Sequence, residues 1–479
     1  MKNNPVVSVL KTDFENVSDF YIKEINLQDG TAVYLAYLRT MVNHVLMSSA
    51  IMEPLQKMNK PFSTVDALME ELSIAGAEKE DQIEKIKNNI LSGFAVLTLG
   101  TQNEAICLPC MGYQKRSIAE PPTSTVLKGP REGFTEDMDI NLSLIRRRLK
   151  TTGFKSETHI VGKYTNTAIA ICYIDTIADK EIVKKIRKRI KSINIDGIID
   201  SFYVQSVLEE RKGNIFKQVG NTEKPDIAVA KMLEGRVLIV VEGSPIVLTL
   251  PYLLFEDFQS SDDYYMQPVR ATLSRLIRVL GIFMAIGLPG LYVALESFHY
   301  ALLPLDFLIN LQSSIKGISF PPLIEILFVI FLFEILNEAS IRMPKYLGMA
   351  LSIVGALVLG ETAVSAGIIS SPAVIIIAIS GITLYTVPDQ VNTASILRII
   401  FTLVGGVAGF YGLIMAFLMT IGYLMTFNSY GAPYLAPFAP IIIADQKDGI
   451  IKTPLQRMEC RPKSFPNKNR VRQKNHERD

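Results

Sequence analysis

Hydrophobic and polar positions follow two different patterns along the chain, and the pattern changes near residue 260. Before this point, short apolar runs with strand or helix periodicity are separated by charged and turn-forming residues, as in soluble α/β proteins. After it, apolar residues continue with few interruptions to about residue 426. The sequence therefore predicts a soluble N-terminal α/β region of two lobes, followed by an α-helical domain with several membrane spans.

The first lobe is predicted to cover residues 1–130. Residues 31–55 start with strand-like residues and pass into an apolar stretch that is compatible with a helix. Residues 73–93 carry apolar residues at helical spacing and end at a glycine, which favours a helix. Residues 94–109 have the pattern of a β-hairpin with polar residues at its turn. This lobe is therefore predicted to have mixed α/β structure.

The second lobe is predicted to cover residues 131–258. A connector rich in Pro, Arg and Gly, residues 116–137, leads into it. Its segments alternate between helix and strand patterns: a helix at 140–150, strands within 157–177, a basic helix at 180–193 and a strand pair at 235–251 that turns at Glu242-Gly243. This order indicates a small sheet covered by helices.

The basic helix could contact nucleic acid or lipid through its Lys and Arg side chains. The favoured interpretation is that these charges form a solvated face opposite an apolar stripe of Ile182, Val183, Ile186 and Ile190. The sequence thus predicts no nucleic-acid partner.

The third segment, residues 259–426, is depleted in charge. Residues 264–426 contain only 14 Lys, Arg, Asp and Glu among 163 residues, so the segment is predicted to be a helical transmembrane domain. A span needs ~20 mostly apolar residues. We predict four to six membrane segments, drawn from five apolar runs at 276–295, 323–336, 347–366, 373–387 and 396–425.

The residues that flank these runs predict the orientation. Residues 427–479 form a basic tail with ten Lys and Arg against five Asp and Glu, which favours the cytoplasmic side, and the tail is predicted to be partly disordered. The N-terminus lacks the apolar core of a secretory signal, so it is expected on the same side. The number of crossings must then be even, and we favour four full crossings plus one partial element. Either 323–336 is that partial element, or 396–425 is broken at Gly405-Gly406.

The run at 347–366 carries small residues at every fourth position. Four residues turn a helix by about 400°, so these positions form one stripe suited to close helix packing: Gly348, Ser352, Ala356 and Gly360. Glu361 belongs to a different face, which it shares with Val354, Leu357, Val364 and Ser365. If copies of the chain pack through the stripe around an axis, this second face would line a cation pore. The alternative is packing within one chain, with Glu361 solvated at the end of the span.

Three charged residues near the end of the second apolar run share one helical face. Glu334, Glu338 and Arg342 are spaced four residues apart. An ion pair between Glu338 and Arg342 would lower the cost of placing these charges near a membrane surface. We predict a structural role for this pair.

Cys107 and Cys110 have C-x-x-C spacing, which is the main hint of metal or redox chemistry. The nearby candidates for further ligands are His159 and Cys172, so a pair of buried thiols is the favoured interpretation. The chain carries no phosphate-binding loop, dinucleotide fingerprint, zinc-protease motif or nucleophile elbow. The sequence therefore predicts a protein that is not an enzyme and that needs no cofactor.

Several long motifs resemble one known family. They are EPPTSTVLKGPREGFTEDMDINLSLIRRRLK at 120–150, LEGRVLIVVEGSPIVLTLP at 233–251, LPGLYVALESFHYALLP at 288–304 and the whole run at 320–388. In these segments the chain resembles the A subunit of GerA-type spore germinant receptors, and the resemblance covers nearly everything after about residue 30. Two positions depart from the family pattern, because Asn337 stands where Arg is usual and Glu361 where Gln is usual.

The resemblance implies a receptor in the inner membrane of the dormant spore. The A subunit would join a transporter-like, nutrient-binding B subunit and a lipoprotein C subunit, and would oligomerise in contact with membrane lipids into a nutrient-gated ion channel. Two other functions stay open at this point. A membrane-anchored scaffold would suit the long α/β region, whereas a secondary transporter would need matching halves that the sequence does not show.

Overall fold

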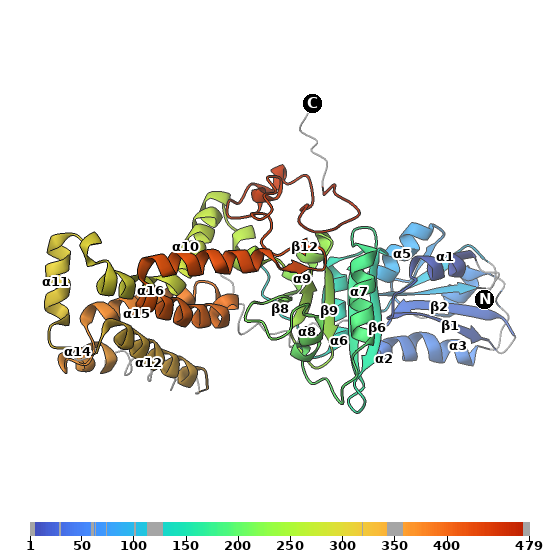
Figure 1. Ribbon diagram of the computed structural model, residues 1–479. Coiled ribbons are helices and arrows are strands. Elements are labelled where there is room, and N and C mark those ends of the chain that lie inside the picture. Colours follow the sequence, from blue (N-terminus) through green and yellow to red (C-terminus); the bar gives the residue numbers. More distant parts are fainter. Residues whose placement is uncertain are drawn as a thin grey trace.

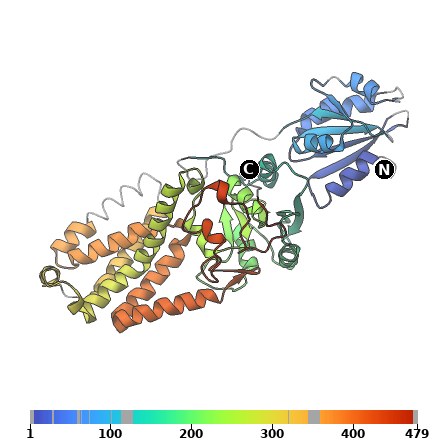
Figure 2. The same ribbon diagram turned by 90° about the horizontal axis from the view of Figure 1, so that it is seen from above.

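The computed structural model describes residues 5–472, apart from 28–29, 59–61, 63, 73, 100–101, 113–127, 319 and 343–357. The chain forms two five-stranded sheets and then a group of helices, placed one after another along an elongated molecule (Figure 1). Seen from above, the first lobe and the helices lie at opposite ends, with the second lobe between them (Figure 2). An N-terminal α/β region followed by helices agrees with the prediction from sequence.

The first sheet is antiparallel, with strand order β1-β2-β4-β5-β3. Helices cover both of its faces, because two separate apolar clusters lie on it. The strands are β1 (Phe20–Asn26), β2 (Ala32–Leu38), β3 (Glu78–Glu80), β4 (Phe94–Leu99) and β5 (Ala105–Pro109). The helices are α1 (Pro5–Asp13), α2 (His44–Met47), the π-helical η1 (Ser48–Met52), α3 (Glu53–Lys57), α4 (Val65–Glu71) and α5 (Ile83–Leu91).

The hairpin predicted at 94–109 is confirmed as β4 and β5. The helix predicted at 73–93 is shorter than expected, since α5 starts only at Ile83. Residues Glu78–Glu80 instead pair with β5 as an edge strand, because charged side chains are tolerated at a sheet edge where they remain in solvent.

The second sheet is also antiparallel, with strand order β6-β7-β9-β10-β8. The strands are β6 (Phe154–Val161), β7 (Thr167–Ile174), β8 (Gly220–Thr222), β9 (Val237–Val241) and β10 (Val247–Leu250). Helices α6 (Met138–Arg148) and α9 (Pro225–Leu233) cover one face, and α7 (Lys180–Lys191) and α8 (Ser201–Leu208) cover the other.

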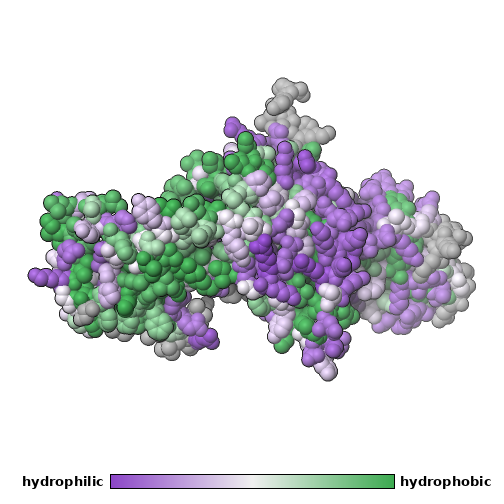
Figure 3. All heavy atoms as spheres, viewed as in Figure 1, coloured by the Kyte–Doolittle hydropathy of each residue, from purple (hydrophilic) through white to green (hydrophobic). Residues whose placement is uncertain are grey.

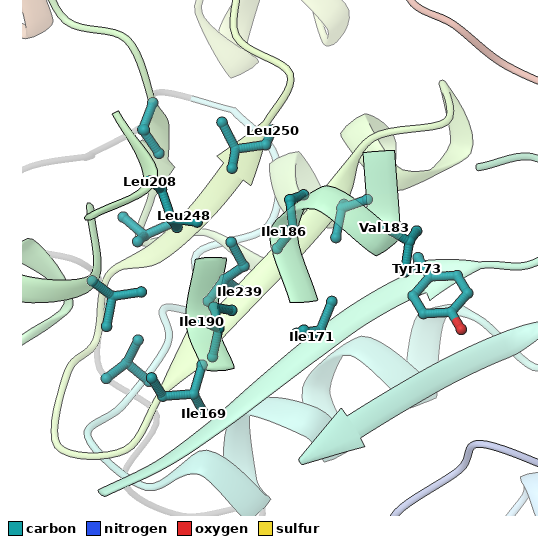
Figure 4. Close-up of a cluster of buried hydrophobic side chains, with 14 of the residues drawn as sticks. Ile169, Ile171, Tyr173, Val183, Ile186, Ile190, Leu208, Ile239, Leu248 and Leu250 are labelled. Atoms are coloured by element: carbon teal, nitrogen blue, oxygen red, sulfur yellow. The ribbon is translucent and has the colours of Figure 1, made fainter. Parts of the chain in front are cut away.

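Helix α7 confirms the interpretation of the basic segment. Its four apolar residues Ile182, Val183, Ile186 and Ile190 are all buried against the sheet, while its Lys side chains are exposed. Its two arginines are half-buried, and Arg187 pairs with Glu157 of β6. Figure 4 shows Ile186 and Ile190 close to Ile169, Ile171 and Ile239 of the strands. Burying such aliphatic side chains contributes about 1.5–3 kcal/mol each, which fixes this helix to the sheet.

The helical domain begins after two 3-10 segments, η2 (Leu254–Phe258) and η3 (Ser261–Tyr264). Its longest helices, α10 and α16, pack along each other, and α15 packs beside α10. The elements are α10 (Pro268–Phe298), η4 (Tyr300–Leu302), α11 (Leu305–Ile315), α12 (Pro322–Arg342), η5 (Val358–Thr362), α14 (Ala363–Ser365), α15 (Ser371–Leu384), η6 (Pro388–Gln390) and α16 (Val391–Met425).

Among the described residues, two helices are long and apolar enough to cross a bilayer, at 268–298 and 388–425. In the most apolar stretch of 18 residues, only 39% of the first helix and 28% of the second is buried within the protein. Both helices therefore differ from the core helices of soluble domains, which are enclosed by protein. Apolar side chains dominate the visible surface of the helical domain, in contrast to the polar lobes (Figure 3). These helices match two of the five predicted spans and indicate association with a membrane, whereas the larger number of crossings stays a prediction.

A break at Gly405-Gly406 in the last helix is one of the two alternatives that the sequence left open, and the helix does not break at that position. Helix α16 departs from helical geometry at Gly409 instead, where φ is 61° and ψ is −153°. Gly405 is needed elsewhere, because a Cβ atom at this position would lie 2.4 Å from the backbone oxygen of Gly290 in α10. The helix stays regular at Gly405 and uses a glycine one turn later for its kink.

The tail folds back onto the second lobe over its described residues, 427–472, although the sequence predicts partial disorder. It contains the short strands β11 (Asn428–Ser429) and β12 (Ala432–Pro433), then η7 (Asp445–Lys447) and η8 (Leu455–Arg457). The hydroxyl group of Tyr430 donates a hydrogen bond of 2.9 Å to the carbonyl oxygen of Leu208. Further along, Asn467 forms a β-bridge with Ala178.

Candidate functional site

The predicted pore segment is described only in its last part. Gly348, Ser352, Val354, Ala356 and Leu357 lie outside the described residues. Gly360 lies in the π-helical turn η5, and a Cβ atom built on it would meet no atom within 4 Å. Glu361 and Ser365 are exposed and Val364 is half-buried. The end of the small-residue stripe therefore packs against nothing in its own chain among the described residues.

Glu338 and Arg342 form the ion pair that their spacing suggests. The Nε atom of Arg342 donates to Oε1 of Glu338 at 2.7 Å. Their side chains are 61% and 77% exposed, respectively, in the isolated chain. An exposed pair of this kind contributes at most about 1 kcal/mol to stability.

Glu334 has a different partner, which its spacing from Glu338 does not reveal. Its Oε1 atom lies 2.5 Å from Nη2 of Arg398 in α16, and it also accepts a hydrogen bond of 2.7 Å from Ser395. Arg398 is fully buried, with Ser380 at 3.4 Å from its Nη1 atom. A guanidinium within apolar helices is costly without a counter-ion, so this pair fixes α12 against α16.

A second buried carboxylate joins α12 to α15. Glu325 is 1% exposed, and its Oε1 atom accepts a hydrogen bond of 2.5 Å from the backbone nitrogen of Ser370. Ser370 itself is the N-cap of α15, so the negative charge lies at the positive end of that helix. The two carboxylates within the run 323–336 therefore hold helices together, and sequence reasoning assigned neither of them this role.

Close contact between glycines joins α10 to α16. A Cβ atom on Gly290 would lie 2.6 Å from the backbone oxygen of Phe401, and one on Gly405 would lie 2.4 Å from that of Gly290. Backbone contact through small residues is the usual means of helix association in lipid. This glycine contact lies between α10 and α16 of one chain, which are helices other than the segment that carries the predicted small-residue stripe.

The joint between the second lobe and the helical domain is rich in charge. Lys217 lies 3.5 Å from Asp257 of η2 and 2.7 Å from Asp389 in η6, the turn between α15 and α16. Asp257 also accepts hydrogen bonds of 2.7 Å from Tyr252 and from Gln390. Burial raises the pKa of Asp257 to about 6, in spite of the attraction of Lys217.

The start of α10 is held by a second group of charges. Arg275 donates at 3.0 Å to Asp263 of η3 and at 3.0 Å to Asp448 of the tail. Arg278 donates to Asp263 at 2.8 Å. Burial would raise the pKa of Asp263, but these two guanidinium groups and a backbone hydrogen bond hold it below its usual value. The segment η3, the helix α10 and the tail are thereby fixed to one another.

The joint between the two lobes contains one ion pair that is sealed from solvent. Asp19 and Arg146 are each 1% exposed, and Nε of Arg146 donates to Asp19 at 2.8 Å. Thr40 donates to the same carboxylate at 2.6 Å and Ser156 at 3.2 Å. Burial alone would raise the pKa of Asp19, but the guanidinium and these hydrogen bonds hold it below its usual value.

The C-x-x-C pair does not converge on one point. Cys107 belongs to one apolar cluster of the first sheet and Cys110 to the other. Burial raises the pKa of both thiols, which disfavours the thiolate needed for metal binding or redox chemistry. In the part of the chain that the structure describes, no three His, Cys, Asp or Glu side chains are grouped to hold a metal ion.

Comparisons with known proteins agree on one family. The profile of the Bacillus/Clostridium GerA spore germination proteins matches residues 8–464. The chain is 35% identical to spore germination protein KA of Bacillus subtilis (strain 168), over 98% of this chain and 87% of that protein. It is 31% identical to spore germination protein GerLA of Bacillus cereus, over 97% of this chain and 95% of that protein.

A solved structure also matches the N-terminal half. It is the N-terminal domain of the A subunit of the Bacillus megaterium spore germinant receptor GerK3, with 26% identity and a TM-score of 0.41. The match covers 53% of this chain and 96% of that domain. From the profile and the full-length relatives we conclude that the chain belongs to the GerA family of spore germination proteins and has a role in spore germination.

Proposed function

We propose that this chain is the A subunit of a nutrient germinant receptor, and that copies of it form a nutrient-gated ion channel in the spore inner membrane. Its family and its two long apolar helices support a membrane-bound receptor subunit. The partners in this proposal are a nutrient-binding B subunit, a lipoprotein C subunit, membrane lipids and further copies of the chain. The N- and C-termini lie on the cytoplasmic side, facing the spore core.

One observation carries the proposal of a homo-oligomer. Gly360 and Glu361 end a segment that is apolar enough for lipid, yet a side chain at Gly360 would meet no atom of the described protomer within 4 Å. A small residue gains nothing from facing lipid, but it allows a neighbouring helix to approach closely. In the proposed assembly, Gly348, Ser352, Ala356 and Gly360 pack against the next copy.

The face beside this stripe then borders the pore. Val354, Leu357 and Val364 form an apolar constriction, and Glu361 and Ser365 add a polar ring. A ring of carboxylates attracts cations and repels anions, so the proposed channel conducts cations. A Gln ring, as is usual in the family, would keep the polarity but lose this electrostatic preference.

Reconstitution tests the channel directly. The chain, alone and with its B and C partners, is placed in liposomes loaded with K⁺, and cation release is recorded with and without nutrient. Glu361→Gln is expected to reduce the preference for cations over anions, and Val364→Ala to increase leak in the absence of nutrient. Asp306→Asn, a change at an exposed carboxylate in α11, is the matched control and should change neither. Assemblies that pass no ions under any of these conditions would contradict the proposal.

A second candidate function is a scaffold that recruits other proteins. It is favoured by large apolar side chains that are exposed on the second lobe, among them Ile160 on β6, and Tyr164 and Ile199 on neighbouring loops. Capture of the partner subunits by the full chain should weaken when Tyr164→Ser and Ile199→Ser are combined. Unchanged capture would leave this surface without a scaffold role.

A further inference from the structure

The tail that follows α16 exposes three isoleucine side chains. Ile441, Ile443 and Ile451 are 73%, 78% and 63% exposed, respectively, in the isolated chain. Ile442, between the first two, packs instead into the small apolar cluster around Phe465. The segment is therefore folded against the protein, and it holds its neighbours Ile441 and Ile443 in an exposed position. Large apolar side chains that a folded segment leaves exposed together mark a surface at which a partner or a membrane binds.

Contacts with α10 fix the place of this segment. Lys452 donates its backbone N–H to the hydroxyl oxygen of Thr272 at 3.0 Å, and Arg275 donates to the carbonyl oxygen of Gly449 at 2.6 Å. A Cβ atom on Gly449 would in turn lie 3.5 Å from the ring of Phe438, so the part of the tail before the isoleucines lies there as well. Figures 1 and 2 both show the tail beside the start of α10. The exposed segment is thus bonded to the first two turns of a helix that is apolar enough to cross a bilayer.

The length of α10 places this end of the helix at the lipid headgroups. Helix α10 has 31 residues and is about 46 Å long, at 1.5 Å per residue. The hydrocarbon core of a bilayer is only about 30 Å thick, so roughly ten residues of α10 must lie outside it. The basic residues of α10 are Arg270, Arg275 and Arg278, and all of them are in its first eleven residues. The end that leaves the hydrocarbon is therefore the end that binds the tail.

An apolar stripe connects the tail to the span. Val269, Leu273, Leu276 and Leu280 recur every three or four residues and are all exposed. They therefore follow one face of α10 from its first turn into the span. Thr272, which accepts the hydrogen bond from the tail, lies only about 60° around the helix from Val269. The tail thus lies beside a surface that faces lipid further along the same helix.

Basic side chains accompany these apolar ones. Arg270 follows Val269 in α10, and Lys447 lies between Ile443 and Ile451 in the tail; both basic side chains are exposed. Lysine and arginine beside an apolar surface attract anionic lipid headgroups, while the apolar side chains reach the acyl chains. This combination, on a surface continuous with a span, favours a bilayer over a soluble protein as the partner.

We propose that residues 441–451 form a membrane-surface anchor on the bilayer that α10 crosses. Ile441, Ile443 and Ile451 insert at the boundary between the headgroups and the acyl chains, and the contacts with Thr272 and Arg275 transmit this depth to the base of α10. The anchor rests on the membrane location in the proposed function, but it does not depend on ion conduction.

The chain contains no tryptophan, so one introduced tryptophan reports on a single place. Ile443→Trp is made in the full chain, which is reconstituted into liposomes of phosphatidylcholine and phosphatidylglycerol. Part of the lipid carries bromine, which quenches tryptophan on contact, either near the headgroup or near the end of the acyl chain. Bromine near the headgroup should remove about half of the fluorescence, because a ring at this boundary has lipid on one side and water on the other. The deeper bromine should quench less.

Three further variants calibrate the result. Ile441→Trp should behave as Ile443→Trp does. Phe283→Trp, at an exposed position in the middle of α10, should be quenched more by the deeper bromine. Tyr21→Trp, at an exposed position of β1 in the first lobe, should be quenched by neither lipid.

The outcomes separate the anchor from the membrane location itself. The anchor is overturned if Phe283→Trp is quenched while Ile441→Trp and Ile443→Trp are not. A shift of their emission to shorter wavelength without quenching would overturn it too, since protein and not lipid would then cover the segment. If Phe283→Trp also escapes quenching, the membrane location in the proposed function is wrong, and the anchor fails with it.

Discussion

The two joints of this molecule are built in different ways. Between the lobes, Asp19 and Arg146 are sealed from solvent and satisfy each other with help from Thr40 and Ser156. Between the second lobe and the helices, Lys217 is shared by two carboxylates beside a cavity of about 620 Å³. The first joint is closed to solutes, whereas the second has room for one and holds a carboxyl group whose pKa is about 6.

The largest expected effect breaks the first joint. Arg146→Ala leaves Asp19 buried without its counter-ion and should lower the free energy of unfolding of the lobes by about 3–5 kcal/mol. Arg39→Ala removes the pair with Asp139, which is about 40% exposed, and should cost no more than about 1 kcal/mol. Thermal unfolding of both variants, followed by circular dichroism, compares them. If both variants lost the same free energy of unfolding, the burial of an ion pair would not determine how much the pair stabilises this joint.

A smaller effect is expected on the helical side of the second joint. Gly405→Ala places a methyl group against the backbone of Gly290 and should destabilise the contact between α10 and α16 by about 1–3 kcal/mol. Gly422→Ala is the control on the same helix, because its Cβ atom would meet nothing within 4 Å. Melting temperatures in detergent should fall for the first variant only. A fall for Gly422→Ala of the same size would contradict the assigned contact.

The smallest effect concerns pH, for which the two joints have opposite signs. The lowered pKa of Asp19 gives stability that is present above about pH 4 and is lost only as pH falls through that lowered pKa. The raised pKa of Asp257 gives stability that is complete below about pH 4 and is lost as pH rises through about 6. Between pH 5 and pH 7.5, stability should therefore decrease on the order of 1–2 kcal/mol as pH rises.

Two substitutions assign this slope. Asp257→Asn removes the titrating group beside Lys217, Asp389 and Glu256, so the dependence of the melting temperature on pH in this window should flatten. Asp19→Asn should lower the melting temperature at every pH in the window without changing the slope. A slope that persists in Asp257→Asn would assign it to another group.

Sequence patterns were sufficient where local spacing decides the structure. The stripe on α7, the β4–β5 hairpin and the β9–β10 hairpin depend on neighbours within a few residues, and all three are as expected. Long-range pairs were not accessible in this way. Glu334 was placed with Glu338 and Arg342 because they share a face, yet its partner Arg398 is 64 residues away.

The same limit applies to glycines and to the tail. A Gly-Gly pair is the statistical place for a helix to break, but α16 uses Gly405 for contact with α10 and bends at Gly409. The basic composition of the tail concealed Tyr430 and Tyr434, whose rings are buried in the lobe and in its junction with the helices. The pore-facing residues and the small-residue stripe stay predictions.

The return of the tail to the second lobe has a mechanical consequence. Arg275 near the beginning of α10 and Asp448 beyond the end of α16 are hydrogen-bonded to each other, so the chain that enters the helical bundle and the chain that leaves it are held together at one place. The first and last helices therefore cannot separate at the end near the lobe without breaking this contact. Displacement is then greatest at the far end, where α11 and α14 lie (Figure 1).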